Sequence, residues 1–225
     1  MQHKQRFTNV TLVTPYGEED KDLLIDGDKI VDILNPNENI SDDWKIIDGH
    51  NKFILPSMID LLQHGFLKYL YGHAEENCTV DNSKILPSVG VTGFLPSTPC
   101  LPPEKTKTLL NALSNDIDKA KEGARVLGIH SEGPCFALPG AHDPKNLRNP
   151  SVPLAEELLD ACQGKLKALT LAPEMNGSEE FIKRLKKEKI SIHLGHSGAN
   201  PIDVPKFADW GVDAVTHMYD ALPTY

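Results

Sequence analysis

Residues 153–196 read PLAEELLDACQGKLKALTLAPEMNGSEEFIKRLKKEKISIHLGH, and this stretch contains the repeating unit of the fold. Its leucines first recur at helical spacing, and that pattern stops at Gly164, a residue type that commonly ends a helix. A short apolar run, 166–171, comes next, followed by a second helical pattern over 179–189 and a second apolar run over 190–194. Because a helix is the usual connection between parallel strands, this order predicts parallel strands joined by helices.

The same alternation covers most of the chain. The runs that we expect to form strands are 53–60, 91–95, 125–129, 166–171, 190–194 and 214–215, and the expected helices are 103–123, 153–164, 179–189 and 203–211. Six strand units with helices between them predict the α/β class, with a parallel sheet that is either open or closed into a barrel.

The beginning of the chain has a different pattern, typical of a small β domain. The expected strands here are 7–13, 23–25, 29–33 and 45–47. Asp26-Gly27-Asp28 separates two of them and predicts a hairpin, because an Asp-Gly pair tolerates positive φ. We therefore predict a small β domain over 1–52 and an α/β domain over 53–225.

Composition and charge exclude several classes of protein. The chain has 23 Lys and Arg against 32 Asp and Glu, a net charge of −9, which argues against a general nucleic-acid or anionic-membrane binder. No apolar run reaches the ~18 residues of a membrane span. The basic start of the chain, Met1–Arg6, is not followed by the apolar segment of a signal peptide, so we expect none. The four cysteines, Cys78, Cys100, Cys135 and Cys162, have no paired spacing, so we expect reduced thiols in a cytoplasmic protein.

Polar residues that can bind a metal follow several of the predicted strands. Glu132, His196 and His217 come at the ends of the third, fifth and sixth runs, and His64 follows the first. The carboxyl ends of parallel strands form one face of a sheet or barrel, so these residues can converge there. Two imidazoles and one carboxylate suit a catalytic zinc with an open fourth position. Such an ion lowers the pKa of bound water to about 7.

A histidine at a strand end is more often a hydrogen-bonded packing residue than a metal ligand. We assign His130 and His193 to that role. His130 and Glu132 point to the same side of one strand, but a single strand rarely gives two ligands to one metal.

Seven stretches, taken in order, resemble the N-acetylglucosamine-6-phosphate deacetylases of the amidohydrolase superfamily. They are 55–60, 90–98, 128–134, 140–144, 170–174, 194–197 and 216–221. The resemblance implies a (β/α)8 TIM-type barrel, of which about six of the eight units are present, plus a small N-terminal β-sandwich domain. It also implies metal-dependent hydrolysis of N-acetylglucosamine-6-phosphate to glucosamine-6-phosphate and acetate, a step of amino-sugar catabolism.

The resemblance also assigns roles to single residues. Glu132, His196 and His217 match the ligands of one divalent metal ion, zinc first, with iron, cobalt or manganese as alternatives. The other matches are His142 and the backbone around Ala141 for the sugar, Asp220 and Ala221 for the phosphate, and His64 beside the metal ligands or the substrate. The implied partner is a small amino-sugar phosphate, with no nucleic acid or membrane, and the full-length form is expected to be a homo-oligomer.

The sequence departs from the family in three ways. The family's catalytic aspartate, on the eighth strand, falls beyond Tyr225, so no catalytic residue is assigned and we expect this fragment alone to be inactive. Leu62 stands where many superfamily members have the first histidine of His-x-His, which predicts one metal and not two. Asp220 replaces a usual asparagine and would repel a phosphate.

Two other functions stay open. One is a related enzyme, acting on another N-acetyl sugar or, like the dihydroorotases, on a cyclic amide. Dihydroorotase-like enzymes often carry a carboxylated lysine on the fourth strand, and Thr170–Glu174 offers none. The other is an inactive remnant that binds a metal or a sugar phosphate.

Overall fold

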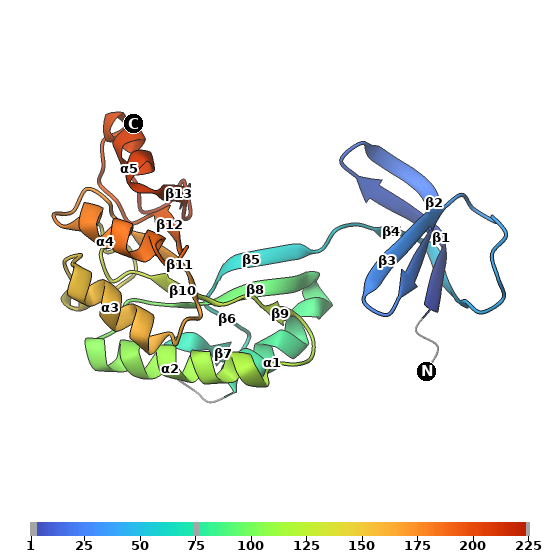
Figure 1. Cartoon of the computed structure of the whole chain (residues 1–225), viewed down its shortest axis with the longest axis horizontal. Coiled ribbons are helices and arrows are strands. Elements are labelled where there is room, and N and C mark those ends of the chain that lie inside the picture. Colours follow the sequence, from blue (N-terminus) through green and yellow to red (C-terminus); the bar gives the residue numbers. More distant parts are fainter. Residues whose placement is uncertain (1–3, 74–76, 224–225) are drawn as a thin grey trace. The chain divides into compact units, whose positions relative to one another are not determined.

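The computed structural model describes residues 4–73 and 77–223. The chain forms two compact units, Met1–Ser57 and Met58–Tyr225, and each is described here by itself (Figure 1). The boundary follows residue 57, whereas the sequence pattern placed it after residue 52, because the last strand of the first unit continues to Ile54.

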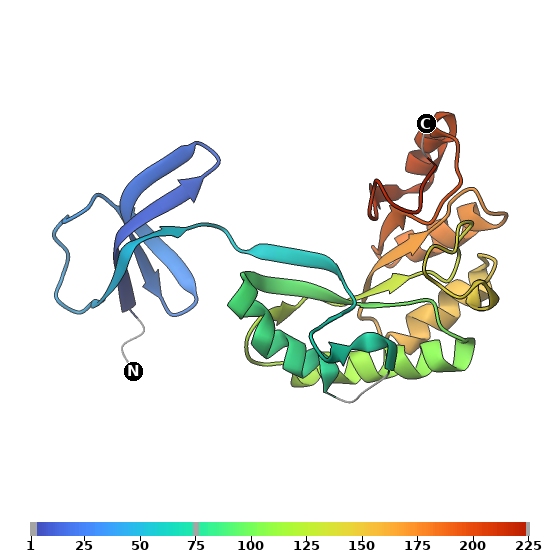
Figure 2. The same cartoon turned by 180° about the vertical axis from the view of Figure 1, so that it is seen from behind.

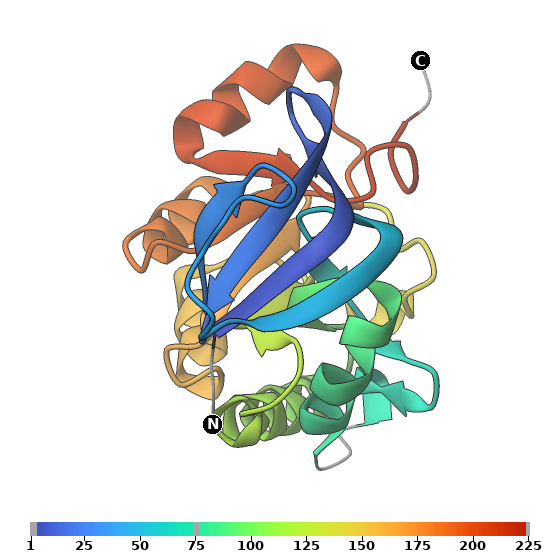
Figure 3. The same ribbon diagram turned by 90° about the vertical axis from the view of Figure 1, so that its right-hand side faces the viewer.

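The first unit is a four-stranded sheet. Its strands are β1 (Lys4–Thr14), β2 (Gly17–Asp26), β3 (Lys29–Leu34) and β4 (Lys45–Ile54). The order is β3-β2-β1-β4, with β1 and β4 parallel and the other pairs antiparallel. Figure 3 shows the twist of these strands in blue. The described residues of this unit thus form a single sheet, and a second layer of the predicted β-sandwich is not among them.

Local chemistry explains the turn that was predicted in this sheet. Asp26 pairs with Lys29, and Gly27 between them has φ 64°, a conformation that glycine adopts without steric cost. The hairpin prediction is therefore confirmed. Val10, Leu12 and Leu23 form the small core of the unit.

The second unit is built on a curled parallel sheet. Its strands are β5 (Met58–Gln63), β8 (Val91–Thr98), β9 (Arg125–Val126), β10 (Ile129–Glu132), β11 (Leu166–Leu171), β12 (Ser191–Leu194) and β13 (Val212–Val215). The order is β13-β12-β11-β10-β8-β5, with β9 paired to β8, and every pairing is parallel. A small antiparallel ribbon, β6 (Gly65–Phe66) and β7 (Tyr69–Leu70), follows β5.

Helices cover the outer face of this sheet (Figures 1 and 2). They are α1 (Cys78–Ile85), α2 (Pro103–Lys119), α3 (Val152–Ala161), α4 (Ser178–Lys186) and α5 (Val204–Trp210), with short 3-10 helices at η1 (Tyr71–His73), η2 (Leu86–Val89), η3 (Pro144–Asn146) and η4 (Pro201–Asp203). Each α-helix contacts the next one along the chain. None of the helices in the described part of the chain is long and apolar enough to cross a membrane.

The core lies between the sheet and these helices. Leucines and a phenylalanine from α2, α3 and α4 pack against strand residues such as Ile129, Leu169 and Ile192. Because side chains alternate along a strand, the residues between them, including His130 and Thr170, point to the inner side of the curl. The fold class is confirmed: the second unit is part of a (β/α)8 barrel.

Helix α1 was not predicted. Its buried side chains include Thr79, Asn82 and Ser83, so no apolar stripe marks it in the sequence. The four predicted helices all form, as α2 to α5, with small differences at their ends.

Candidate metal centre

Three side chains meet at the carboxyl ends of the strands. Glu132 is the last residue of β10, and His196 and His217 each lie two residues beyond the end of β12 and β13. Both histidines have positive φ, 51° and 33°, which is uncommon for residues other than glycine. The backbone therefore turns sharply after each strand, at the positions that carry these imidazoles.

The three ligand atoms are at mutual distances that suit a tetrahedral ion. Glu132 Oε1 lies 3.2 Å from His217 Nε2 and 3.4 Å from His196 Nε2, and the two Nε2 atoms are 3.1 Å apart. Zinc binds nitrogen and oxygen at about 2.0–2.1 Å, so tetrahedral ligand atoms are about 3.3 Å from one another. Glu132 and His196 are buried and His217 is partly exposed.

The hydrogen bonds of the two imidazoles fix their tautomers. His196 Nδ1 lies 3.0 Å from Leu138 O, and His217 Nδ1 lies 2.9 Å from Asp220 O. A carbonyl oxygen only accepts, so each Nδ1 carries the proton and each neutral ring keeps a lone pair on Nε2. Two lone pairs and a carboxylate oxygen then converge without a proton to share, which is an arrangement that fits a cation.

Two further histidines contact the other oxygen of Glu132. His64 Nε2 is 2.9 Å and His142 Nε2 is 3.5 Å from Oε2. The N–H of Cys100 donates to His142 Nδ1 at 3.3 Å, so the proton of His142 is on Nε2 and this ring is a donor, unlike His196 and His217.

These contacts shift two pKa values. Burial opposes the ionisation of Glu132, but contacts with the surrounding imidazoles, His142 first, outweigh it and hold the pKa of the carboxyl well below its usual range. The hydrogen bond to Glu132 raises the pKa of His64, against a smaller effect of burial. Glu132 is therefore a carboxylate throughout the neutral range.

The centre opens into a cavity of about 560 Å³. Its lining residues are His64, Pro99, Glu132, Gly140, Ala141, His142, His196, His217, Asp220 and Ala221. Every site residue selected from the sequence is among them. Pro99 and Gly140 were not selected. Gly140 has φ 55°, and a Cβ there would lie 2.8 Å from His196 Cε1, so only glycine fits beside that ring.

The two backbone groups assigned to a phosphate are already hydrogen-bonded. The N–H of Asp220 donates to His217 O at 2.8 Å, and the N–H of Ala221 donates to Asp220 Oδ1 at 3.0 Å. The carboxylate of Asp220 thus occupies the donor that a phosphate oxygen would need.

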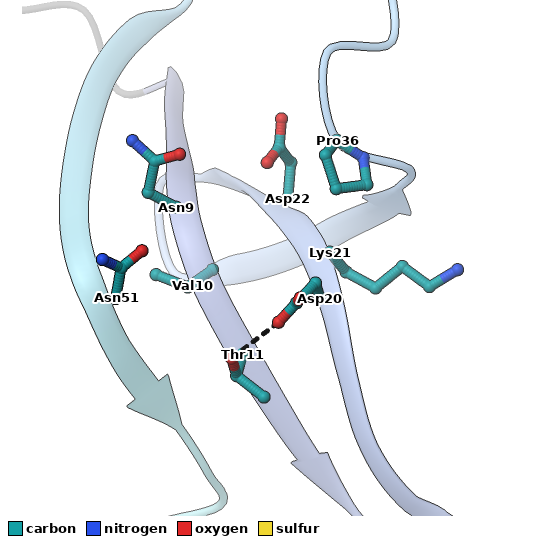
Figure 4. A pocket seen from close by; sticks show the side chains of 8 residues that line it. All are labelled: Asn9, Val10, Thr11, Asp20, Lys21, Asp22, Pro36 and Asn51. Atoms are coloured by element: carbon teal, nitrogen blue, oxygen red, sulfur yellow. Dashed lines mark hydrogen bonds between the residues drawn. The ribbon is translucent and has the colours of Figure 1, made fainter.

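A second hollow, of about 200 Å³, lies in the first unit (Figure 4). Figure 4 shows Thr11 hydrogen-bonded to Asp20 and the Lys21 side chain pointing away from the other lining residues. Asp22 at its rim forms a buried ion pair with Arg6. Across residues 4–73 and 77–223, the only group of three side chains placed to hold a metal is Glu132, His196 and His217.

No protein-family model matches the chain. It is 29% identical over 229 residues to the N-acetylglucosamine-6-phosphate deacetylase of Danio rerio, and this alignment covers 96% of this chain and 55% of that protein. It is 31% identical over 135 residues to the N-acetylgalactosamine-6-phosphate deacetylase of Escherichia coli O157:H7, covering 59% of this chain and 36% of that protein.

A solved structure is similar over nearly the whole chain. The N-acetylglucosamine-6-phosphate deacetylase of Thermotoga maritima is 31% identical, with a TM-score of 0.78, over 97% of this chain and 56% of that one. The chain spans just over half the length of the Danio rerio and Thermotoga maritima proteins.

Proposed function

This chain is homologous to the N-acetylglucosamine-6-phosphate deacetylases, and on that basis we propose that it carries the metal-binding and sugar-binding part of a deacetylase site. The proposed reaction is hydrolysis of the acetamide group of an N-acetyl amino-sugar phosphate, in which a C–N bond other than a peptide bond is cleaved. The observation that carries the proposal is that Glu132 Oε1 and the Nε2 atoms of His196 and His217 lie 3.1–3.4 Å from one another.

The proposed ligands of one divalent ion are Glu132, His196 and His217. Two imidazoles and a carboxylate favour zinc, and iron, cobalt and manganese accept the same atoms. Leu62 has no lone pair to offer, which favours one ion over two. When bound, the ion would supply a Lewis acid beside the acetamide carbonyl and ionise water at neutral pH.

The chain's own residues orient the substrate. The Nε2–H of His142 lines the cavity and lies 3.5 Å from Glu132 Oε2, and the N–H of Cys100 holds the ring in that tautomer. We assign the His142 N–H, with the backbone at Ala141, to the sugar. His64 Nε2 lies 2.9 Å from the other oxygen of Glu132 and keeps that carboxylate oriented.

The described lining of the cavity has two carboxylates, Glu132 and Asp220. Glu132 is a proposed metal ligand surrounded by imidazoles, and Asp220 accepts the N–H of Ala221 in the turn after His217, so we assign the general base to neither. A missing general base typically costs 10²–10⁴-fold in rate. We therefore propose that this chain alone binds the metal and the sugar but releases acetate slowly.

A related substrate is the second candidate. Asp220 would repel a phosphate that approaches Ala221, and this favours an N-acetyl sugar whose phosphate lies elsewhere or is absent. Independently of Asp220, the similarity to an N-acetylgalactosamine-6-phosphate deacetylase makes the 4-epimer, which keeps the 6-phosphate, a further candidate substrate.

Calorimetry tests both candidates. The chain, stripped of metal with a chelator and then reloaded with Zn²⁺, is titrated with N-acetylglucosamine-6-phosphate, N-acetylgalactosamine-6-phosphate and N-acetylglucosamine. We expect Zn²⁺-dependent binding of at least one sugar, and acetate release at least about 100-fold below that of a relative with its full length. Binding that does not depend on Zn²⁺, or acetate release at the rate of the relative, contradicts the proposal.

A further inference from the structure

A line of hydrogen-bonded side chains crosses the inner side of the sheet directly below the metal centre. His130 on β10 contacts Leu61 O through Nδ1 at 2.6 Å and Thr170 Oγ1 through Nε2 at 2.7 Å. Thr170 Oγ1 on β11 lies 2.7 Å from Thr216 Oγ1, and Thr216 Oγ1 lies 3.5 Å from His193 Nδ1 on β12. His130, Thr170, Thr216 and His193 are all buried.

The donor and the acceptor of each hydrogen bond in the line follow from the first one, between His130 and Leu61 O. Leu61 O only accepts, so His130 carries its proton on Nδ1 and its Nε2 accepts from the hydroxyl of Thr170. Thr170 has then used its one proton, so the hydroxyl of Thr216 donates to it. Thr216 has likewise used its proton, and His193 Nδ1–H donates to Thr216 across the longer contact.

Residues of this hydrogen-bonded line lie close to the proposed metal ligands in the sequence and in the sheet. His130 is two residues before Glu132 on the same strand, and Thr216 directly precedes His217. Thr170 pairs with Glu132 in the sheet, and its carbonyl accepts the N–H of Gly133 at 3.0 Å.

The methyl group of Thr170 lies against Gly195, the residue before the third ligand. A Cβ on Gly195 would lie 2.6 Å from Thr170 Cγ2, and Gly195 directly precedes His196. Thr170 is therefore adjacent to the strand ends that carry all three ligands.

We propose that this one-directional hydrogen-bond chain, with Thr170 at its centre, holds the ends of β10, β12 and β13 at the separation that brings Glu132, His196 and His217 together. Thr170, Thr216 and His130 are then positioning residues, which act on a bound ion only through its ligands. The proposal rests on the proposed metal site.

These directions hold for a neutral His130 ring, because a second proton on Nε2 would make that nitrogen a donor and reverse the bond to Thr170.

The first test reads the tautomers in the unaltered protein. Long-range ¹H–¹⁵N NMR spectra of the histidine rings distinguish Nδ1–H from Nε2–H. We expect His130 and His193 to be neutral Nδ1–H tautomers at pH 7. An Nε2–H tautomer of His130 would reverse the bond to Thr170 and overturn the proposal. This outcome does not depend on whether the centre binds a metal.

The second test measures metal affinity after the central hydroxyl is removed. Thr170→Val keeps the shape of the side chain but breaks the line, and Thr170→Ser keeps the hydroxyl. Titration with Co²⁺, followed by its visible absorption, should show affinity about tenfold or more lower for Thr170→Val. We expect Thr170→Ser to stay within about threefold of the parent.

Thr106→Val is the matched control. Thr106 is buried and donates to Leu101 O at 3.0 Å at the start of α2, away from the centre. It should lower the melting temperature and leave Co²⁺ affinity unchanged. If Thr170→Val binds Co²⁺ like the parent, the positioning role is wrong. If Thr170→Val does not fold, the tautomer of His130 decides the question. A parent chain that binds no Co²⁺ refutes the proposed function itself.

Discussion

Gly140 offers a sharp test of how the His196 ring is held. Replacing it with alanine places a Cβ 2.8 Å from His196 Cε1 and 3.0 Å from Nδ1. Ordinary carbon contacts begin near about 3.5 Å, so the ring must move by about 0.7 Å. That movement displaces the Nε2 atom that faces Glu132 and disturbs the hydrogen bond from Nδ1 to Leu138 O.

Gly164 is the matched control for this substitution. Gly140 and Gly164 both have positive φ, 55° and 77°, and nothing lies within 4 Å of a Cβ built on Gly164. Alanine in this conformation costs about 1–2 kcal/mol at either position. Both variants should therefore lose at least this much stability in urea unfolding, and Gly140→Ala should lose more because of its contact with His196.

Only Gly140→Ala should weaken metal binding, by about tenfold or more, because only its Cβ meets a ligand. Co²⁺ titration of the two variants, under conditions where both are folded, measures this difference. Equal Co²⁺ affinities for Gly140→Ala and Gly164→Ala would refute the reasoning that the His196 ring is fixed by this contact.

Three more predictions concern other parts of the molecule. Asp220→Asn should raise the affinity for N-acetylglucosamine-6-phosphate, measured by calorimetry, because it removes a negative charge beside the Ala221 N–H. Unchanged affinity would argue against a phosphate at that position. The four cysteines are all buried, and burial raises the pKa of Cys135 and of Cys162 to about 12. A thiol reagent at pH 8 should therefore label the folded chain slowly and all four cysteines after unfolding, and rapid labelling of the folded chain would show the packing to be wrong. Leu110→Ala, in the core, should lower the free energy of unfolding in urea by about 2–5 kcal/mol, whereas Ile202→Ala, at an exposed position, should lower it little. Similar losses of stability in the two variants would contradict the burial described here.

The last three strands of the second unit were predicted most closely. The predicted ends at residues 171, 194 and 215 match β11, β12 and β13, whereas β5, β8 and β10 continue three residues beyond the predicted runs. The apolar run 166–171 matches β11 residue for residue, and the polar residues that follow the strands meet because parallel strands end on one face. The convergence of Glu132 with His196 and His217 follows from topology alone, so local sequence patterns were sufficient to predict it.

Features that depend on tertiary contacts could not be predicted. Helix α1 buries polar side chains, and Asn82 in it bonds to the backbone of Phe66 and Tyr69, contacts that no periodicity reveals. Gly140 matters only because His196 lies against it in space.

Two predicted roles gained detail that the sequence does not carry. His130 was assigned to packing, and the structure shows which atoms it bonds and therefore its tautomer. Ala221 was assigned to a phosphate, but its N–H donates to the side chain of Asp220, a contact that needs both this side chain and the turn after His217.

The most direct test of the proposed centre is the zinc content of the chain. Inductively coupled plasma mass spectrometry, after dialysis against metal-free buffer, counts the zinc ions bound to each chain and to the folded variants His196→Ala, His217→Ala and His50→Ala. We predict one zinc ion in the parent and in His50→Ala, whose imidazole is exposed in the first unit, and substantially less than one in the other two. A parent without zinc, or full zinc content in His196→Ala and His217→Ala, would contradict the assignment of these ligands.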